Sequence, residues 1–225
     1  MTINISEIIS RGNVNSKDAY ECAGLANKIF NRASKIEPKI TNDVISAVSN
    51  SGCKMYGLKY RLKQPTSIAG KIASDAKEKN ISFEEAGNGI KDSIRYTSIS
   101  NTKSFVKNYN AIKTNLENKG YEEVQCKNYF ELYRQGRVMH KAVQSVFMDK
   151  NGNIFELQFH TPSSQAAKEL KLPLYEERRK AGINKTRVKE LESEMQYLAN
   201  RVKDPKYIDS ILSHSIIDIS KSKIF

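Results

Sequence analysis

The sequence predicts a single α+β unit in which a mixed sheet of about five strands is flanked by helices. Segments of strand character lie in the middle of the chain, at residues 55–63, 90–99, 121–126, 139–148 and 153–161. Helical patterns occupy both ends, and an Asn-Gly dipeptide, a strong hairpin signal, separates the last two strand segments. Strands in the middle with helices at both ends are typical of the α+β class.

The first 53 residues predict a helical scaffold. Residues 1–16 are polar and irregular, so we expect them to be loosely held. An apolar stripe then predicts a helix from about Ser16 to Lys35, which Pro38 interrupts. A second helix is expected from Thr41 to about Ser51.

Residues 54–205 form the predicted catalytic domain. Its first strand, 55–63, alternates apolar residues with Lys59, Arg61 and Lys63 and so has a basic face. Between the strands we expect a helix at 68–79, a loop or short helix at 81–89 and a helix at 104–119. After the last strand the expected helices are 163–170, 175–181 and 185–201, followed by a tail, 206–225, with a short helix and a frayed end.

The last strand carries the residues around which we organise the chemistry. Phe155, Leu157 and Phe159 share one face and predict a core contact. Glu156, Gln158 and His160 share the other face. Such a polar row is either a solvated face or the floor of an active site, and we favour the floor.

Composition favours anionic partners. The 225 residues include 37 Lys+Arg and 25 Asp+Glu, a formal net charge of +12. Nucleotides, nucleic acid or an acidic membrane surface would suit this charge, although solubility alone explains it equally well. No apolar run is long enough to span a bilayer and no secretory signal is visible, so we expect a cytoplasmic site of action, with delivery by a specialised secretion system left open. The odd number of cysteines, Cys22, Cys53 and Cys126, favours free thiols.

The first candidate site is a basic segment that runs from the first strand into the following helix. Arg61 and Lys63 lie two apart on the predicted strand, and Ser67 and Lys71 lie four apart on the helix, so each pair shares a face. A helix N-terminus at their junction would favour an anion, and the group suits a polyphosphate. A solvated basic face is the alternative. There is no glycine-rich phosphate loop and no GxSxG or GxGxxG motif in the sequence.

Two carboxylates complete the set of candidates. Asp92, near the start of the second strand and close to Arg95, is a natural Mg²⁺ ligand, because Mg²⁺ takes one or two carboxylates together with substrate phosphate oxygens. A simple cap of the strand is the alternative. Glu156 could be a second metal ligand or a base on a hydroxyl, and Gln158 or His160 could contact phosphate or ribose.

In this order, the segments YRLKQPTSIAGKI, KDSIRYT and FELQFHT resemble the synthetase domain of the RelA/SpoT family. The toxin branch of that family is closest, because its strand tends to read FEVQFHTP before LYEERR-like sequence, and this chain continues with AKELKLPLYEERR. The resemblance spans about residues 35–205. It implies a nucleotidyltransferase-like fold and a Mg²⁺-dependent pyrophosphokinase that transfers the β,γ-pyrophosphate of ATP to the 3′-hydroxyl of a purine nucleotide. The separate hydrolase domain of the family is absent, so synthesis alone is expected.

The resemblance also implies roles for individual residues. It places Arg61, Lys63, Ser67 and Lys71, with Arg95, on the ATP phosphates, Asp92 on Mg²⁺, and Glu156 on Mg²⁺ or the attacking hydroxyl. Tyr133, His140, Gln158 and His160 would contact the acceptor.

Two departures from the family pattern are visible. In the family's Gly-Tyr-x-x-x-His segment the tyrosine stacks on the acceptor base, but here Tyr133 lies three residues too early relative to His140. Strict alternation along the second strand would put Asp92 and Arg95 on opposite faces, so a bend or bulge is expected there.

Three functions remain open from the sequence. The first is alarmone-like synthesis on GDP, GTP, ADP or AMP by a growth-inhibiting toxin or effector, with a possible neutralising partner protein. The second is pyrophosphorylation of an RNA 3′ end such as that of tRNA, which the net charge and a basic run favour. This run could equally be a solvated face. Its members are Arg178, Arg179, Lys180, Lys185, Arg187 and Lys189. The third is a binding module that kept the fold and lost the chemistry.

Overall fold

The computed structural model of the protein describes residues 3–178 and 182–216. Its centre is a six-stranded sheet in the order β1-β2-β5-β4-β3-β6. The strands are β1 Lys54–Tyr56, β2 Arg95–Ile99, β3 Tyr121–Asn128, β4 Val143–Asp149, β5 Ile154–His160 and β6 His214–Ser215. The β2–β5 pair is parallel and the other pairs are antiparallel, so the predicted α+β class with a mixed sheet is confirmed.

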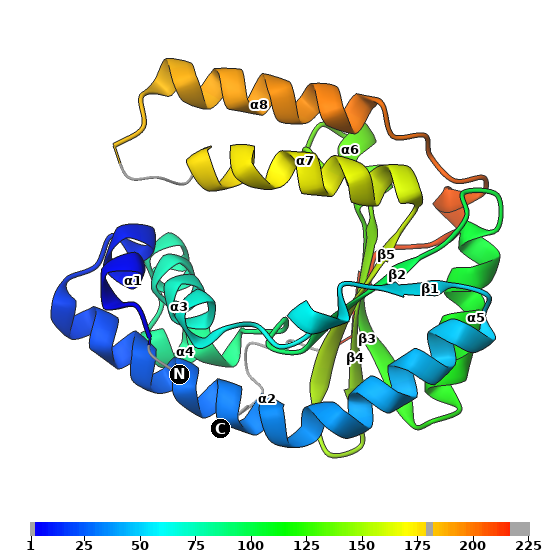
Figure 1. The fold of residues 1–225 in the computed structure, drawn as a ribbon, viewed down its shortest axis with the longest axis horizontal. Helices are drawn as coiled ribbons and strands as arrows, with labels where there is room; N and C mark the ends of the chain where they lie inside the picture. Colours follow the sequence, from blue (N-terminus) through cyan, green and yellow to red (C-terminus); the bar gives the residue numbers. More distant parts are fainter. Residues whose placement is uncertain (1–2, 179–181, 217–225) are drawn as a thin grey trace.

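Helices surround this sheet (Figure 1). They are α1 Ile5–Gly12, α2 Ser16–Asn50, α3 Pro65–Lys79, α4 Phe83–Asn88, α5 Phe105–Glu117, α6 Tyr129–Arg134, α7 Pro162–Arg178 and α8 Lys185–Asn200, with 3₁₀ turns at Leu58–Tyr60 and Ile208–Ser210. Figure 1 shows the α7–α8 hairpin and the α1, α3 and α4 group on the same side of the sheet, opposite α5. None of the helices in the described ranges is both long and apolar enough to cross a membrane.

The helix α2 connects two hydrophobic cores. Its first half, through Ile29, packs with α1, α3 and α4, and its second half packs with α5 and the sheet. The prediction of two helices separated at Pro38 is wrong, because α2 runs through this proline without ending. Burial of apolar side chains on both halves offsets the backbone hydrogen bond that proline cannot make.

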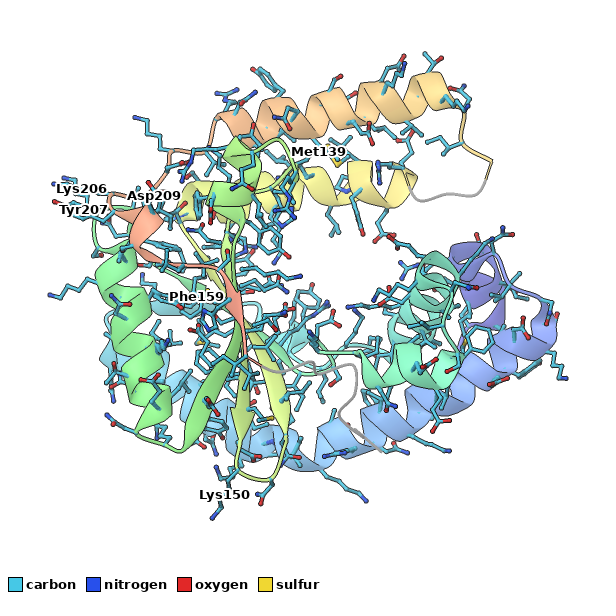
Figure 2. All side chains as sticks on the ribbon, turned by 180° about the vertical axis from the view of Figure 1, so that it is seen from behind. Met139, Lys150, Phe159, Lys206, Tyr207 and Asp209 are labelled. Carbon is cyan, nitrogen blue, oxygen red and sulfur yellow. The ribbon has the colours of Figure 1, made fainter. Side chains whose placement is uncertain are left out.

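The core under the sheet is built on the apolar face of β5. Phe155 is fully buried, and its ring contacts those of Tyr96, Tyr121 and Phe147 at centroid distances of 5.8, 5.3 and 5.5 Å. Figure 2 shows Phe159 among the side chains of this layer, whereas Lys150, at the tip of the β4–β5 hairpin, points outward. The hairpin turns at Gly152, whose φ of 77° suits glycine, so the predicted Asn-Gly turn is confirmed.

The predicted first strand, 55–63, is mostly wrong. β1 ends at Tyr56, Gly57 adopts a left-handed φ of 63°, and a 3₁₀ turn follows. The second predicted strand is shorter than expected, because β2 starts at Arg95. Asp92 therefore lies in the preceding loop, and the bulge that strict alternation required is not needed.

Other differences lie near the ends of the chain. The helix α1 replaces the irregular segment expected at 1–16, and α7 is one helix that continues through Pro173. The helix α6 was not predicted, and β4 begins at Val143, later than expected. The tail contains the expected short helical turn at Ile208–Ser210, but it then adds β6 to the sheet. The expected frayed end at 217–225 lies outside the described residues.

Two glycines give a matched test of the α1–α3 contact. A Cβ on Gly12 would meet the Cβ of Ala73 at 2.3 Å, whereas a Cβ on Gly24 of α2 would meet nothing within 4 Å. We expect Gly12→Ala to lower the free energy of unfolding by about 1–3 kcal/mol through overpacking. Gly24→Ala should raise it by about 0.5–1 kcal/mol, because alanine has the higher helix propensity. Urea denaturation of both variants measures this, and an unchanged stability of Gly12→Ala would contradict the close contact.

Candidate active site

A cationic cavity of about 550 Å³ lies between α3, α1 and α7. Five of the predicted site residues line it, namely Lys63, Ser67, Lys71, Asp92 and Arg95. Two further arginines, Arg11 of α1 and Arg178 of α7, also line it and were not predicted for this site. The structure therefore brings together four of the five predicted phosphate-binding residues around one predicted metal ligand.

Asp92 is the centre of this cavity. Its carboxylate is 8% exposed and accepts hydrogen bonds from Lys63 Nζ at 2.5 Å and from Lys71 Nζ at 2.9 Å. Arg95 Nη1 lies 3.9 Å from the same carboxylate. Burial alone would raise the pKa of Asp92, but the charges of Lys63 and Lys71 outweigh burial and hold this pKa below its ordinary value. Asp92 is therefore an ionised, electrostatically fixed group.

Arg61 is placed elsewhere. Its Nε donates to Glu37 Oε1 at 2.5 Å, its Nη1 donates to the Leu58 carbonyl at 3.1 Å, and it does not line the cavity. The predicted common face of Arg61 and Lys63 is wrong, because the 3₁₀ turn replaces the strand that would have created it. A role for Arg61 on ATP stays a prediction from the motif.

Glu156 lies on the parallel neighbour of β2, in register with Arg95. It is 4% exposed, and its two oxygens accept hydrogen bonds from the side-chain amides of Gln144 and Gln158. Burial raises the pKa of Glu156, and the negative charge of Asp92 raises it further. Glu156 and His160 are buried and Gln158 is half-buried, so the polar face of β5 is not a solvated face.

A second cavity, of about 380 Å³, lies on the other side of Gln158, between the sheet and the α7–α8 hairpin. Its walls include the apolar residues Val138, Met139, Ala142, Leu172 and Met195. Leu172, Tyr175 and Arg178 line both this cavity and the cationic one, so the two adjoin. A mostly apolar cavity with a few polar groups is typical of a small-molecule site.

Two tyrosines, Tyr129 and Tyr175, line this second cavity, and neither was predicted as a site residue. The ring of Tyr129 lies 4.2 Å from the ring of His140, with a tilt of 40° between the planes, and both residues line the cavity. Desolvation of the His140 ring, together with the nearby charges of Lys171 and Lys168, lowers its pKa. Counting along the family motif could not find Tyr129, because the helix α6 and a loop separate it from His140.

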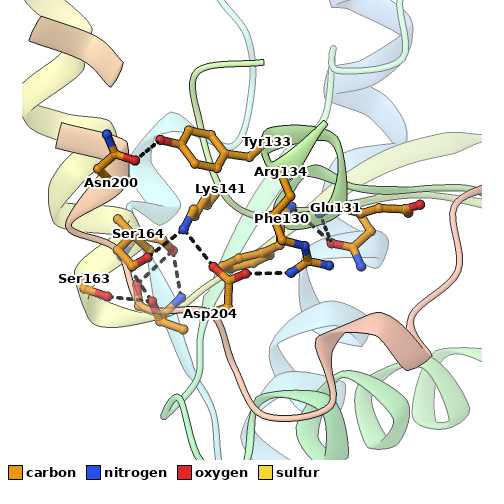
Figure 3. Close-up of polar contacts among 12 residues, drawn as sticks. Phe130, Glu131, Tyr133, Arg134, Lys141, Ser163, Ser164, Asn200 and Asp204 are labelled. Carbon is orange, nitrogen blue, oxygen red and sulfur yellow. Dashed lines mark hydrogen bonds and ion pairs between the residues drawn. The ribbon is translucent and has the colours of Figure 1, made fainter. Parts of the chain in front are cut away.

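Tyr133, the predicted acceptor-binding residue, does not line this cavity, and its hydroxyl is directed at Asn200 (Figure 3). Its hydroxyl donates to Asn200 Oδ1 at 2.6 Å and accepts from Gln196 Nε2 at 2.8 Å. Lys141 lies over its ring and donates to Asp204 Oδ1 at 2.8 Å. These contacts attach α6 to the end of α8, so the role of Tyr133 in this structure is to hold these two helices together.

The other predicted acceptor residues line the second cavity. Gln158 connects Glu156 to Lys168, whose Nζ donates to Gln158 Oε1 at 2.5 Å. His160 is 3% exposed, and its Nδ1 lies 2.9 Å from the Ser164 hydroxyl at the start of α7. Burial holds the pKa of His160 well below its ordinary value, so this ring is neutral. His160 is thus a fixed polar group at the base of the cavity.

Two of the four described members of the basic run proposed for RNA, Arg178 and Arg187, are in ion pairs. Arg178 pairs with Glu192 at 2.7 Å, and Arg187 pairs with Glu177 at 2.7 Å and with Glu190 at 3.1 Å. Arg179 and Lys180 lie outside the described residues. Nothing in this part of the chain singles out a nucleic-acid surface.

Asp92 and Glu156 fit the predicted Mg²⁺ site by their chemistry. Both are buried carboxylates, and the negative charge of Asp92 contributes to the raised pKa of Glu156. A separate group of possible ligands, Glu123, Cys126 and His214, lies at the β3–β6 edge. Glu123 there already accepts hydrogen bonds from the hydroxyl of Tyr109 and from Lys113.

Lys171 provides a pH test of the second cavity. Its Nζ donates to the Met139 carbonyl at 2.7 Å, and burial lowers its pKa from 10.5 to about 8. Between those pH values the unfolded chain binds more protons than the folded chain, so this lysine makes stability rise with pH. Relative to Lys171→Met, the wild type should gain roughly 1–3 kcal/mol across this window in urea denaturation. A difference that does not change with pH would contradict the assigned burial of Lys171.

Comparison with known proteins gives structural likenesses alone. No family model matches the chain, and no curated protein matches it. Small alarmone synthetase 1 from Bacillus subtilis, bound to its product pppGpp, is 15% identical over 66% of this chain and 70% of that chain, with a TM-score of 0.46. The Type VI effector Tas1, in complex with its immunity protein, is 13% identical over 77% and 94%, with a TM-score of 0.48. The protein smu.1046c from Streptococcus mutans UA159 is 12% identical over 76% and 86%, with a TM-score of 0.47.

Proposed function

We propose that the protein is a Mg²⁺-dependent pyrophosphokinase that transfers the β,γ-pyrophosphate of ATP to the 3′-hydroxyl of a purine nucleotide. The observation that carries this proposal is the position of Glu156. This buried carboxylate lies on β5 beside Arg95 of the cationic cavity and is hydrogen-bonded to Gln158, which lines the apolar cavity. A donor in one cavity and an acceptor in the other would therefore meet at Glu156.

The cationic cavity suits the triphosphate of the donor. Lys63, Lys71 and Arg95 converge on Asp92, and Ser67 adds a hydroxyl from the first turn of α3. Phosphoryl transfer needs alignment and stabilisation of charge more than covalent chemistry from the protein. The two lysines that hold Asp92 are also the cations that phosphate oxygens would contact.

Asp92 and Glu156 are the residues that would hold Mg²⁺, with phosphate oxygens completing its ligands. Bound there, the ion would supply positive charge beside the β- and γ-phosphates. If Asp92 and phosphate oxygens hold the ion without Glu156, the carboxylate of Glu156, whose pKa burial raises, would instead accept the proton of the 3′-hydroxyl. The 3′-oxygen would bond to the β-phosphorus while the bond from that phosphorus to the α,β-bridging oxygen breaks, and AMP would leave.

The apolar cavity suits the purine of the acceptor. A base can stack on the Tyr129 ring beside His140, while the apolar wall excludes water. Gln158, which is hydrogen-bonded to Glu156, and His160 line the cavity and would contact the ribose or its phosphates. This assignment replaces Tyr133 by Tyr129 and keeps the other predicted acceptor residues.

The resemblance to the toxin branch extends the proposal to the role of the enzyme. Consumption of ATP and production of an alarmone-like nucleotide would inhibit growth, and a protein that covers the cavities would neutralise it. Both statements rest on the three ordered motifs together with the catalytic proposal.

Glu156→Gln tests the proposed chemistry, because it keeps the shape of the side chain and removes the carboxylate. We expect wild-type protein with ATP, Mg²⁺ and GDP, GTP, ADP or AMP to give a new pyrophosphorylated product on ion-exchange chromatography. The variant should lose about a hundredfold or more of this activity, as expected for loss of a general base. Induced expression of the wild type should arrest bacterial growth, and expression of the variant should not. If wild-type protein yields no product with any acceptor, the proposal is wrong.

A pair of tyrosine variants tests the acceptor site. Tyr129→Leu keeps an apolar side chain but removes the ring, and we expect it to raise the acceptor KM about tenfold, the scale of one lost stacking contact. Tyr133→Phe removes the hydrogen bonds to Asn200 and Gln196, so it should lower stability and leave the acceptor KM near the wild-type value. The opposite pattern would return the stacking role to Tyr133. Steady-state kinetics with varied acceptor at saturating ATP separates the two.

A further inference from the structure

The helix α1 adds a residue to the cationic cavity that the motifs do not contain. Asn4 caps the helix by accepting the Glu7 backbone N–H, and its own N–H donates to Thr66 in the first turn of α3. Ile8 and Gly12 of α1 are buried in this contact. As a result Arg11, in the last turn of α1, lies beside Ser67 and Lys71 at the cavity wall.

The contact between α1 and α3 leaves room for the Arg11 side chain at Gly70. Gly70 lies in the middle of α3, where glycine costs about 1 kcal/mol relative to alanine. A Cβ on Gly70 would meet Arg11 Cδ at 3.1 Å and Arg11 Cβ at 3.5 Å. The stem of Arg11 therefore crosses α3 over the one residue that has no side chain, one position before Lys71.

Two carboxylates hold the guanidinium group. Arg11 Nε lies 3.2 Å from Glu7 Oε1 on the same helix, and Arg11 Nη2 donates to Glu176 Oε2 on α7 at 3.1 Å. Glu176 lines the cavity, and Glu7 does not. The Arg11 side chain is 25% exposed, so the pair with Glu176 is partly desolvated but open to competition from an anion.

We propose that Arg11 is an additional phosphate ligand for the donor nucleotide, and that Glu176 is the group that the phosphates displace from it. This inference rests on the proposed function, since it takes the donor to be ATP. Phosphate oxygens are strong acceptors for a guanidinium, which can bind two of them with parallel N–H groups. Glu7 would keep Nε oriented while the Nη atoms exchange the Glu176 carboxylate for phosphate.

Removal of Arg11 and removal of Glu176 should change phosphate binding in opposite directions. Removal of the cation deletes a phosphate contact, whereas removal of the competing carboxylate frees the cation. The cavity wall carries five cations, Arg11, Lys63, Lys71, Arg95 and Arg178, and four acids, Asp75, Glu78, Asp92 and Glu176. Asp75 pairs with Lys79, and Asp92 is held by Lys63 and Lys71 with Arg95 at 3.9 Å, whereas Glu176 is the acid of this wall that pairs with Arg11.

Calorimetric titration of the intact protein with Mg²⁺ and a non-hydrolysable ATP analogue tests this inference. Arg11→Gln should weaken analogue binding about tenfold, the scale of one lost charge-assisted hydrogen bond. Glu176→Gln should tighten it about threefold, the scale of one exposed ion pair. Equal affinities of wild type and both variants would overturn the proposal.

Two further variants keep the test specific. Glu7→Gln makes the same change in charge on the same arginine but outside the cavity, so it should not tighten binding. Equal tightening by Glu7→Gln and Glu176→Gln would show a general charge effect and overturn the displacement. Gly70→Ala should weaken binding in the same direction as Arg11→Gln, because the added methyl group moves the Arg11 stem. Circular dichroism and urea denaturation of each variant identify any that fail to fold. Even if other variants fail, Glu176→Gln alone shows whether removal of this carboxylate tightens or weakens analogue binding.

The outcomes also separate this inference from the proposed function. If the wild type does not bind the analogue at all, the donor assignment fails and Arg11 has no phosphate to contact. If the wild type binds it and makes product, but the Arg11 and Glu176 variants bind it equally well, the proposed function stands and this inference fails.

Discussion

The burial of Asp92 is the constraint on which the site depends. A carboxylate that is 8% exposed cannot stay ionised without compensation, and two ammonium groups at 2.5 and 2.9 Å provide it. Each ammonium comes from a different element, Lys63 from the segment after the 3₁₀ turn and Lys71 from α3. Loss of either lysine would leave the buried Asp92 carboxylate with one ammonium partner instead of two, which is destabilising. The pairing therefore holds α3, this segment and the loop before β2 in one arrangement.

The pKa of the second carboxylate, Glu156, is shifted in the opposite direction to that of Asp92. Glu156 receives neutral amide donors from Gln144 and Gln158, so burial prevails and its pKa rises, whereas that of Asp92 falls. Two nearby acids with oppositely shifted pKa values can have different roles, one as a fixed negative charge and the other as a proton acceptor. The sheet produces this difference, because Glu156 lies within a central strand and Asp92 lies in a loop that lysines can reach.

The features that could be predicted from the sequence are those that local residue patterns determine. The features that could not be predicted depend on how the helices pack. The alternation on β5 and the Asn-Gly hairpin follow from residue period and order, whereas the grouping of Lys63 and Lys71 with Asp92 was expected only from the resemblance. The helix α1 is short and polar on one side, so it forms because α3 covers its apolar face, and Arg11 was lost with it. Tyr129 was missed for a related reason, because its distance from His140 is set by how α6 packs and not by spacing along the chain.

Arg61 shows how a motif residue can serve a site that it does not line. Its guanidinium is bound to Glu37, which lies in the middle of α2 next to Pro38, where this helix passes between the two hydrophobic cores. Its backbone carbonyl accepts the Arg95 N–H at 2.8 Å, and two residues later the Lys63 N–H donates to the Ser93 carbonyl at 3.0 Å. These bonds fix the backbone on both sides of Leu62 against the start of β2. The Arg-x-Lys spacing therefore has a physical reason in this structure. Arg61 attaches the segment to Glu37 of α2, and Lys63 reaches the carboxylate of Asp92 in the cationic cavity.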